Sequence, residues 1–284
     1  VVGNHKGKNK FLKLLGTFER TFKLYSKIKP FDIKISVGGD ASNYLAKMKF
    51  KKSITFDDNE TAPNWRYSKF VDFAFWPISV SKNILLKQGF KSKSLYQYNG
   101  FKEDIYIADY IPNEDFLSSI PFKDYFLVRP ENINANYIQN GSVKSIVPKL
   151  LSILSRNGAN IIYLPRYNMD LNYAKGIKNI YIPDKPINGL DACYYSTAVL
   201  TGAGTLAREA ACLGVPAVSF YAGKTILAVD QKMIKDELIF FSRDSDSIFK
   251  YLKNIKRKDL NFDRSKCVKE EVMTKLDEVI DNLV

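Results

Sequence analysis

The stretch LTGAGTLAREAACLGVPAVSF, residues 200–220, joins two apolar segments through a turn built almost entirely of small residues. The segment that ends at Thr201 predicts a strand, the run that stops at Gly214 predicts a helix, and PAVSF predicts a second strand. Strand, tight turn and helix in this order are typical of parallel α/β sheets. The stretch therefore predicts an α/β fold and singles out the turn as a place where chemistry can occur.

The turn at residues 202–205 is suited to a diphosphate. Backbone without bulky side chains approaches a ligand closely, and a helix N-terminus presents unpaired N–H groups and a partial positive charge. Glu209 lies one turn into the helix, where its carboxylate would accept hydrogen bonds from a ribose diol. The alternative interpretation is that the glycines only allow tight packing of strand on helix, and that Glu209 is a solvated acid.

The rest of the chain repeats the alternation of strands and helices. Helices are expected over 11–28, after Asp40 as an N-cap, and up to Gly158, with a kink or a late start at Pro148. The two runs of alternation meet near residues 100–120 and predict two doubly wound, Rossmann-like lobes. The expected domains are an N-terminal lobe over 1–118, a C-terminal lobe over 119–260 and a terminal helix over 261–284.

Ligands of doubly wound sheets lie beyond the carboxyl ends of the strands, so the residues that follow each strand are the candidates for binding. Arg129 and Arg166 each close a strand of the second lobe, and a planar guanidinium suits phosphate oxygens. The alternative for Arg129 is a structural ion pair with Glu131. The candidate nucleotide-binding residues are Arg129, Arg166, Gly202, Ala203, Gly204, Thr205, Arg208, Glu209 and Lys224.

Acidic residues follow a strand of the first lobe, at Asp57, Asp58 and Glu60. They would bind a divalent metal through oxygens, or one of them would act as a general base. The alternative is a solvated acidic turn that caps a helix over APNWRY. The neighbouring Trp65 and Tyr67 are expected in the core rather than as a stacking platform.

Composition excludes several classes of protein. The net charge is +13, but 34 lysines against 9 arginines are spread along the chain, which favours a solvated surface over nucleic-acid binding. A basic start with Lys6, Lys8, Lys10 and Lys13 would favour peripheral association with an anionic membrane. The 3 cysteines fit neither a disulfide framework nor a metal site, which indicates a reducing, cytoplasmic setting. No apolar run reaches the roughly 18 residues of a membrane span.

The stretch around Glu209 resembles the second-lobe motif of GT-B glycosyltransferases and of UDP-N-acetylglucosamine 2-epimerases. In those families a small-residue turn meets the diphosphate, and a Glu followed by small residues and Gly-x-Pro binds the ribose. The matching positions are Glu209, Ala210, Ala211, Gly214 and Pro216. The whole chain resembles an uncharacterised, largely archaeal family through VVGNHKGK, FDDNETAP, YNGFKEDIYI, VRPENINANY, YLPRY, GAGTLAREAA and AGKTILAVD.

Members of that family begin with about 60 further residues, a strand–loop–helix unit and a second strand, so the first lobe is expected to be incomplete here. The resemblance implies a protein that binds a nucleotide-diphosphate sugar, such as a UDP-sugar. We expect a glycosyltransferase acting on a polysaccharide or lipid-linked acceptor, with Asp58 or Glu60 as base, no cofactor and an optional divalent metal. The alternatives are a 2-epimerase, disfavoured because His5 is the 1 histidine, and a binding protein without turnover.

Overall fold

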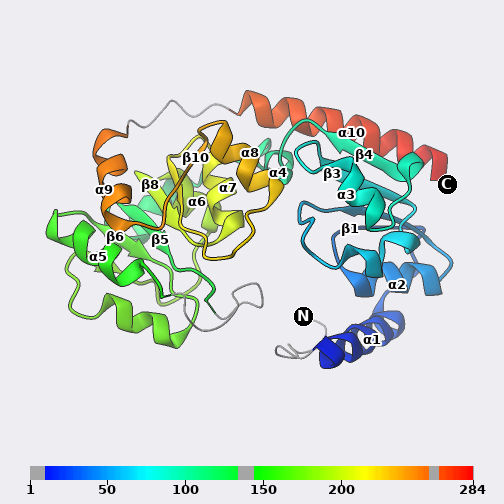
Figure 1. Cartoon of the computed structure of the whole chain (residues 1–284), viewed down its shortest axis with the longest axis horizontal. Coiled ribbons are helices and arrows are strands. Elements are labelled where there is room, and N and C mark those ends of the chain that lie inside the picture. Colours follow the sequence, from blue (N-terminus) through cyan, green and yellow to red (C-terminus); the bar gives the residue numbers. More distant parts are fainter. Residues whose placement is uncertain (1–9, 134–143, 256–261, 284) are drawn as a thin grey trace. The chain divides into compact units, whose positions relative to one another are not determined.

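The computed structural model describes residues 10–133, 144–255 and 262–283. The chain forms two compact units (Figure 1). The first contains residues 1–105, 227–229 and 267–284, and the second contains residues 106–226 and 230–266. Each unit is built around its own parallel sheet, so the expected α/β fold with two parallel sheets is confirmed.

The first unit has a four-stranded parallel sheet in the order β1-β2-β3-β4. The strands are β1 (Ile33–Val37), β2 (Lys52–Phe56), β3 (Phe73–Pro77) and β4 (Leu95–Tyr98). The helices are α1 (Lys10–Lys27), α2 (Asp40–Met48), α3 (Lys82–Lys87), α4 (Lys102–Ile107) at the boundary, and the terminal α10 (Asp263–Leu283). Short 3₁₀ turns lie at η1 (Asn64–Arg66), η2 (Ser68–Phe70) and η3 (Ser92–Ser94).

One part of the core of the first unit forms between the sheet and α10. Ile54, Phe75 and Tyr98 of three strands pack against Val268 and Val272 of that helix. Burial of these apolar side chains stabilises the unit by roughly 1.5–3 kcal/mol for each one. The last helix of the sequence is thereby an integral part of the first sheet's packing.

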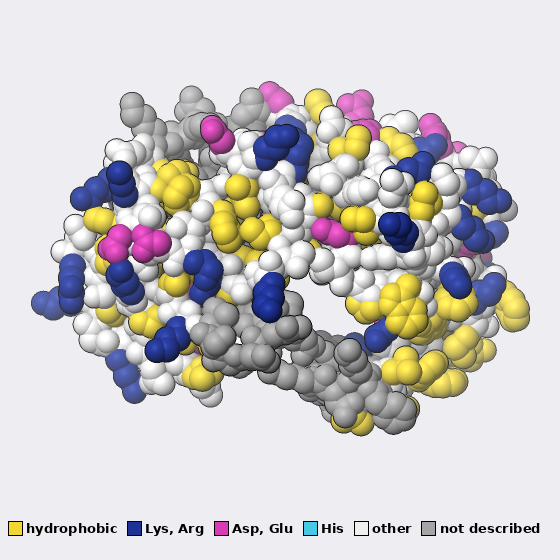
Figure 2. Space-filling model, viewed as in Figure 1, with side chains coloured by type: hydrophobic (Ala, Val, Ile, Leu, Met, Phe, Trp, Pro, Cys, Tyr) yellow, Lys and Arg dark blue, Asp and Glu magenta, His cyan; other side chains and the backbone are white. Residues whose placement is uncertain are grey.

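Helix α1 keeps several large apolar side chains in solvent. It packs on α2 through a narrow face that includes the buried Thr17 and Thr21. Apolar side chains gather over this part of the molecule (Figure 2), and the exposed ones on α1 are Leu12, Leu14, Leu15, Phe18, Phe22 and Tyr25. Contiguous exposed apolar faces are often interaction surfaces in proteins.

The second unit has a six-stranded parallel sheet in the order β10-β9-β8-β5-β6-β7. The strands are β5 (Phe126–Arg129), β6 (Ile161–Tyr163), β7 (Ile180–Tyr181), β8 (Ala198–Thr201), β9 (Ala217–Ser219) and β10 (Ile239–Phe241). The helices are α5 (Val147–Arg156), α6 (Gly189–Tyr194), α7 (Gly204–Cys212), α8 (Ala228–Lys235) and α9 (Ser245–Asn254), with 3₁₀ segments η4 (Glu114–Ser119) and η5 (Asn168–Ala174).

The strand order of the second sheet reverses at its centre. From β5 the chain proceeds to β6 and β7 on one side, and then returns to place β8, β9 and β10 on the other. The adjacent ends of β5 and β8 form a topological switch point, where neighbouring loops diverge and leave a crevice for a ligand. Helices α5 and α9 cover one face of this sheet through Leu150, Leu154 and Ile248.

Several local expectations are corrected. Asp40 is the first residue of α2 rather than its cap, because Gly39 occupies the N-cap position and no side-chain cap bond forms. The segment APNWRY forms 3₁₀ turns instead of a helix. The late start at Pro148 is confirmed, since α5 begins at Val147. Among the described helices, none combines the length and apolar character needed to cross a membrane.

Candidate functional site

The loops after β5 and β8 touch at the switch point. The backbone N–H of Gly202 donates to the carbonyl of Arg129 at 3.1 Å. A Cβ at position 202 would lie 2.5 Å from the Cα of Glu131, closer than Cβ atoms approach backbone. Position 202 therefore requires glycine because the two loops approach closely, which is the packing role considered above for the glycines of this turn.

The turn uses some of its own amides and leaves others unused. The N–H of Ala203 donates to Thr201 Oγ1 at 2.9 Å, so this amide and that of Gly202 are both engaged by the protein. The N–H groups of Gly204, Thr205 and Leu206 open α7 and have no acceptor in residues 10–133, 144–255 and 262–283. The anion-binding capacity of this turn thus lies in the first turn of α7, one residue later than the sequence suggests.

Two arginines lie beside this helix terminus. The Nε atom of Arg129 is buried and makes no hydrogen bond to any described residue. Burial lowers the pKa of Arg129, the positive charge of Arg166 lowers it further, and the nearby carboxylate of Glu209 opposes this. A buried, unpaired guanidinium nitrogen next to a second arginine is unfavourable in isolation, and a bound anion relieves both the desolvation and the repulsion.

Arg166 is held by its own loop. Its Nε donates to the carbonyl of Pro130 at 3.0 Å, and its backbone N–H donates to Asp170 Oδ2 at 2.9 Å. Asp170 is itself buried and also accepts from the backbone of Tyr167. The loop after β6 is therefore rigid, and it presents this arginine close to the end of β5.

Glu209 is positioned by a tyrosine. The hydroxyl of Tyr106 donates to Glu209 Oε1 at 2.9 Å, which orients the carboxylate on the exposed side of α7. Arg208 is only 4% exposed and pairs with Asp230 at 2.9 Å, so its guanidinium is engaged in an internal ion pair. Lys224 lies exposed in the loop after β9. The structure thus brings together Arg129, Arg166 and Glu209 at the start of α7. Arg208 is instead bound to Asp230 inside the unit.

The acids of the first unit are engaged to different degrees. Asp57 is buried, accepts hydrogen bonds from the amides of Asp58 and Asn59, and accepts from the hydroxyl of Tyr67 at 2.6 Å. Burial raises the pKa of Asp57 despite these bonds. Asp58 pairs with Lys102 at 2.7 Å, and Glu60 accepts from the backbone N–H of Ala228 at 2.7 Å. These bonds shape the loop, which is more than a solvated acidic turn.

Asp40 is a functional candidate that the sequence analysis treated only as a cap. It follows Gly38 and Gly39, whose φ angles of 53° and 94° carry the backbone sharply away from the end of β1. Burial raises the pKa of Asp40, while Arg66, 3.7 Å away, acts in the opposite direction. The signal available in the sequence was the order strand, Gly-Gly, acid, which places a carboxylate at the ligand-binding edge of a sheet.

The two aromatic residues near the acids, Trp65 and Tyr67, differ in burial. Tyr67 is 3% exposed and lies in the core as expected, but Trp65 is 63% exposed, so the expectation for Trp65 is wrong. The two residues are separated by one position across the end of η1, and a 3₁₀ turn directs side chains two positions apart to different sides. No cluster of three metal-ligating side chains occurs in the described part of the chain. His5 lies outside the described residues.

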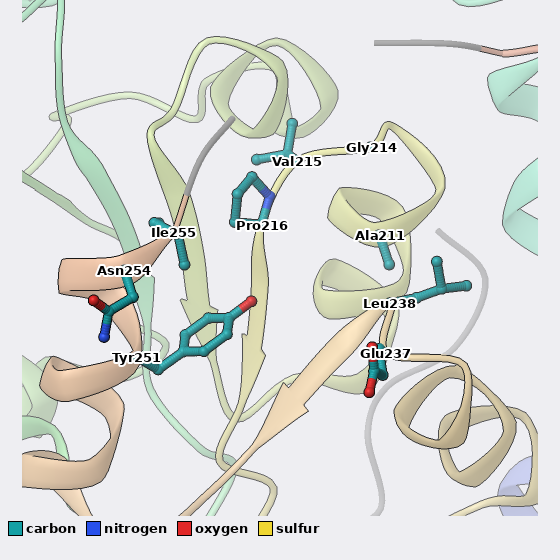
Figure 3. Close-up of a pocket in the computed structure, with 9 residues that line it drawn as sticks. All are labelled: Ala211, Gly214, Val215, Pro216, Glu237, Leu238, Tyr251, Asn254 and Ile255. Atoms are coloured by element: carbon teal, nitrogen blue, oxygen red, sulfur yellow. The ribbon is translucent and has the colours of Figure 1, made fainter. Parts of the chain in front are cut away.

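A separate pocket of ≈ 300 Å³ lies at the opposite edge of the second sheet (Figure 3). Gly214 and Pro216 lie between the end of α7 and the start of β9, Leu238 precedes β10, and Ile255 follows α9. The pocket is thus at the amino ends of the strands. It is distinct from the switch point, where Arg129 and the start of α7 lie.

Comparison with known proteins identifies the family. A family model described as "Protein of unknown function (DUF354)" matches residues 6–283. The chain belongs to this family. An uncharacterised protein of Methanocaldococcus jannaschii is 30% identical over 122 residues, which are 43% of this chain and 35% of that protein. The DUF354 chain thus matches about a third of the length of this curated relative.

Solved structures share the architecture. The UDP-GlcNAc 2-epimerase of Methanocaldococcus jannaschii, in complex with UDP-GlcNAc and UDP, is 17% identical with a TM-score of 0.64, over 92% of this chain and 80% of that one. The S. aureus MnaA–UDP structure is 12% identical with a TM-score of 0.63, over 94% of this chain and 80% of that one. The glycotransferase of kitacinnamycin is 10% identical with a TM-score of 0.61, over 100% of this chain and 86% of that one. These similarities show the fold, and the GT-B type is confirmed.

Proposed function

We propose that this DUF354 protein binds a nucleotide-diphosphate sugar on its second unit, with UDP-sugars as the first candidates. The observation that carries the proposal is the unpaired, buried Nε of Arg129 beside Arg166, next to the unused amides at the start of α7. A diphosphate supplies the negative charge and the acceptor oxygens that this arrangement lacks. UDP and UDP-GlcNAc in two of the structurally similar proteins are consistent with this choice.

Each part of the nucleotide has its own group in this proposal. The diphosphate accepts from the amides of Gly204, Thr205 and Leu206, while the amide of Ala203 keeps its bond to Thr201. Glu209, oriented by Tyr106, accepts hydrogen bonds from the ribose hydroxyls. Arg129, Arg166 and Lys224 offset the charge that develops on the diphosphate when it leaves.

The reaction that we propose is glycosyl transfer. The oxygen of an acceptor hydroxyl bonds to the anomeric carbon, the bond from that carbon to the diphosphate breaks, and a carboxylate of the first unit takes the hydroxyl proton. Asp58 and Glu60 are candidates for this base from the sequence. Asp40 joins them because its raised pKa makes it a better proton acceptor than an ordinary aspartate. A divalent metal is optional in this scheme, since cationic side chains serve the same purpose.

A 2-epimerase is the second candidate. The observation that favours it is that burial raises the pKa of both Asp40 and Asp57, since epimerisation needs carboxyl groups that both give and take protons. Incubation with UDP-GlcNAc distinguishes glycosyl transfer from epimerisation. Transfer yields UDP and a glycosylated acceptor, whereas epimerisation yields a sugar inverted at C2. Binding with neither product identifies a protein without turnover.

The acceptor in this proposal is a polysaccharide or a lipid-linked sugar, the latter at the cytoplasmic face of an anionic membrane. Two features of α1 support the proposed membrane contact. They are its exposed apolar face and the exposed Lys23 and Lys27. Lys6 and Lys8 lie outside the described residues. Co-sedimentation with phosphatidylglycerol vesicles, but not with phosphatidylcholine vesicles, is expected, and loss of co-sedimentation on Phe22→Ser would identify α1 as the contact.

Calorimetry with UDP-GlcNAc tests the nucleotide site. Arg129→Ala is expected to weaken binding about 10–100-fold, the range for losing a hydrogen bond to a charged group. Arg156→Ala is the matched control, because Arg156 is exposed at the end of α5, away from the switch point. Equal affinity of wild type and Arg129→Ala, or no binding of UDP-GlcNAc or UDP by the wild type, would remove the proposal.

A further inference from the structure

Trp65 is an exposed tryptophan at the carboxyl edge of the first sheet. It is 63% exposed, whereas Trp76, the other of the chain's 2 tryptophans, is fully buried. Burial of an aromatic side chain stabilises a fold, and the protein forgoes this contribution at position 65. A large aromatic ring kept in solvent is a common element of a binding surface.

The residues on both sides of Trp65 are held by hydrogen bonds. Asn64 donates through Nδ2 to the carbonyl of Asn59 at 2.9 Å and to Gln88 Oε1 at 3.0 Å. On the other side, the carbonyl of Arg66 accepts from the hydroxyl of Tyr44 at 3.0 Å. The ring is therefore carried by a rigid three-residue turn rather than by a mobile loop.

Polar groups of the candidate catalytic edge surround this turn. Arg66 lies 3.7 Å from the Asp40 carboxylate, and its guanidinium carbon lies 5.7 Å from the centroid of the Trp65 ring. Tyr67, two residues after the tryptophan, donates to Asp57. The ring is thus adjacent in the chain to residues that contact two of the acids at the carboxyl edge.

A flat apolar ring bordered by carboxylates and a guanidinium matches a sugar. A pyranose presents C–H groups on its faces, which pack on an aromatic ring, and hydroxyls around its rim, which bond to carboxylates and guanidinium groups. Exposure of an aromatic ring alone does not make such a site, as Phe50 illustrates. It is 93% exposed, but it lies in the turn before β2, at the amino edge of the sheet, away from these acids.

We infer that Trp65 is the stacking platform for the sugar ring of the acceptor, with Asp40 and Arg66 bonding to its hydroxyls. The inference rests on the proposed function in that it names the acceptor side of the same reaction. It predicts saccharide binding by the first unit whether or not a nucleotide is present, so the two can fail separately. The shared ligand is a pyranose, supplied by a free polysaccharide or by a lipid-linked sugar.

Tryptophan fluorescence of the full chain tests this inference. Chitotriose, maltotriose and mannotriose form one arm, and a glycolipid in detergent micelles with matched sugar-free micelles forms the other. A ligand on Trp65 is expected to shift its emission and to protect it from acrylamide, while the buried Trp76 contributes a constant background. A response in the first arm identifies free saccharide as the source, and a response only in the second identifies lipid-linked sugar. No response in either arm overturns the inference.

Variants separate stacking from a general effect on the fold. Trp65→Ser is expected to weaken saccharide affinity by at least about tenfold, and Trp65→Phe is expected to recover part of it because a smaller ring remains. Affinity of these two variants is measured by calorimetry with the responding ligand, and Phe50→Ser is the matched control. UDP-GlcNAc affinity stays unchanged in all three variants. Equal saccharide affinity of wild type and Trp65→Ser overturns the inference, whereas saccharide binding without nucleotide binding overturns only the proposed donor site.

Discussion

The carboxyl edges of the two sheets carry opposite chemistry. In the first unit, Asp40 and Asp57 follow neighbouring strands, and burial raises the pKa of both. In the second unit, Arg129 ends β5 and Arg166 follows the neighbouring β6, and burial together with the charge of Arg166 lowers the pKa of Arg129. The same parallel architecture thus holds carboxyl groups with raised pKa values at one sheet edge and a pair of arginines at the other. The strands supply position, and the residues that follow them decide the chemistry.

Arg129 and Lys34, two basic residues whose pKa burial lowers, differ as well. Arg129 lies near another arginine and near Glu209, with one nitrogen left unpaired. Within the described part of the chain, Lys34 of β1 has neutral partners only, because its Nζ donates to Asn43 Oδ1 at 2.6 Å, to Thr55 Oγ1 at 2.9 Å and to the carbonyl of Ile54. A cation with unused donors suits a ligand, whereas a cation whose donors are filled by neutral oxygens is part of the framework.

The largest expected effect is that of Asp40→Asn. If Asp40 is the base, turnover of UDP-GlcNAc falls about 10²–10⁴-fold, the usual contribution of such a group. Wild-type turnover rises with pH through the raised pKa of Asp40, because the carboxylate must be ionised to accept a proton. UDP release and the C2 configuration are followed by NMR over a range of pH. Asp32→Asn is the matched control, since Asp32 is exposed at the amino edge of β1.

Retention of the wild-type rate and pH profile by Asp40→Asn would move the base to Asp58 or Glu60. UDP-GlcNAc affinity is expected to stay unchanged in Asp40→Asn. A loss of that affinity would contradict the proposed roles of the two sheet edges, because it would place donor binding on the first unit.

Lys34 makes the stability of the protein depend on pH. Burial lowers the pKa of Lys34 from 10.5 to about 7. Between these values the unfolded chain binds a proton that the folded chain does not, so the free energy of unfolding rises with pH across this window, by up to about 1.4 kcal/mol per pH unit. Urea unfolding at pH 7 to 10 measures the slope.

Lys34→Met is expected to lose this slope, because methionine does not titrate. Lys52→Met, at an exposed position at the start of β2, is the matched control. Parallel pH curves for wild type and Lys34→Met would contradict the prediction, because they would show that Lys34 stays charged in the folded state across this range.

The smallest of these effects is that of Gly202→Ala. The added Cβ would lie 2.5 Å from the Cα of Glu131, so the loops after β5 and β8 must separate, at a cost of about 1–3 kcal/mol. Thermal unfolding is expected to occur at a lower temperature, together with weaker UDP-GlcNAc binding. Gly189→Ala is the control, because nothing lies within 4 Å of a Cβ there. An unchanged melting temperature would show that the switch point adapts freely.

The sequence was most informative about features that are local. Apolar periodicity and glycine turns predicted the alternation of strands and helices, and the residues after the strands included Arg129, Arg166 and Glu209. The short β7 was not predicted, because two residues carry too little periodicity. The cap at Asp40 was misplaced by one residue, which concealed a candidate acid behind a structural role.

The sequence by itself determined the α/β class, the family and the small-residue turn before Glu209, because these depend on patterns within a few residues of chain. Only the tertiary structure decided which amides of that turn are used, that Arg208 is consumed by Asp230, and that Trp65 is exposed. Each of these depends on whether residues far apart in the chain meet. Burial and hydrogen-bond partners are properties of the packed fold, and no local pattern of residues specifies them.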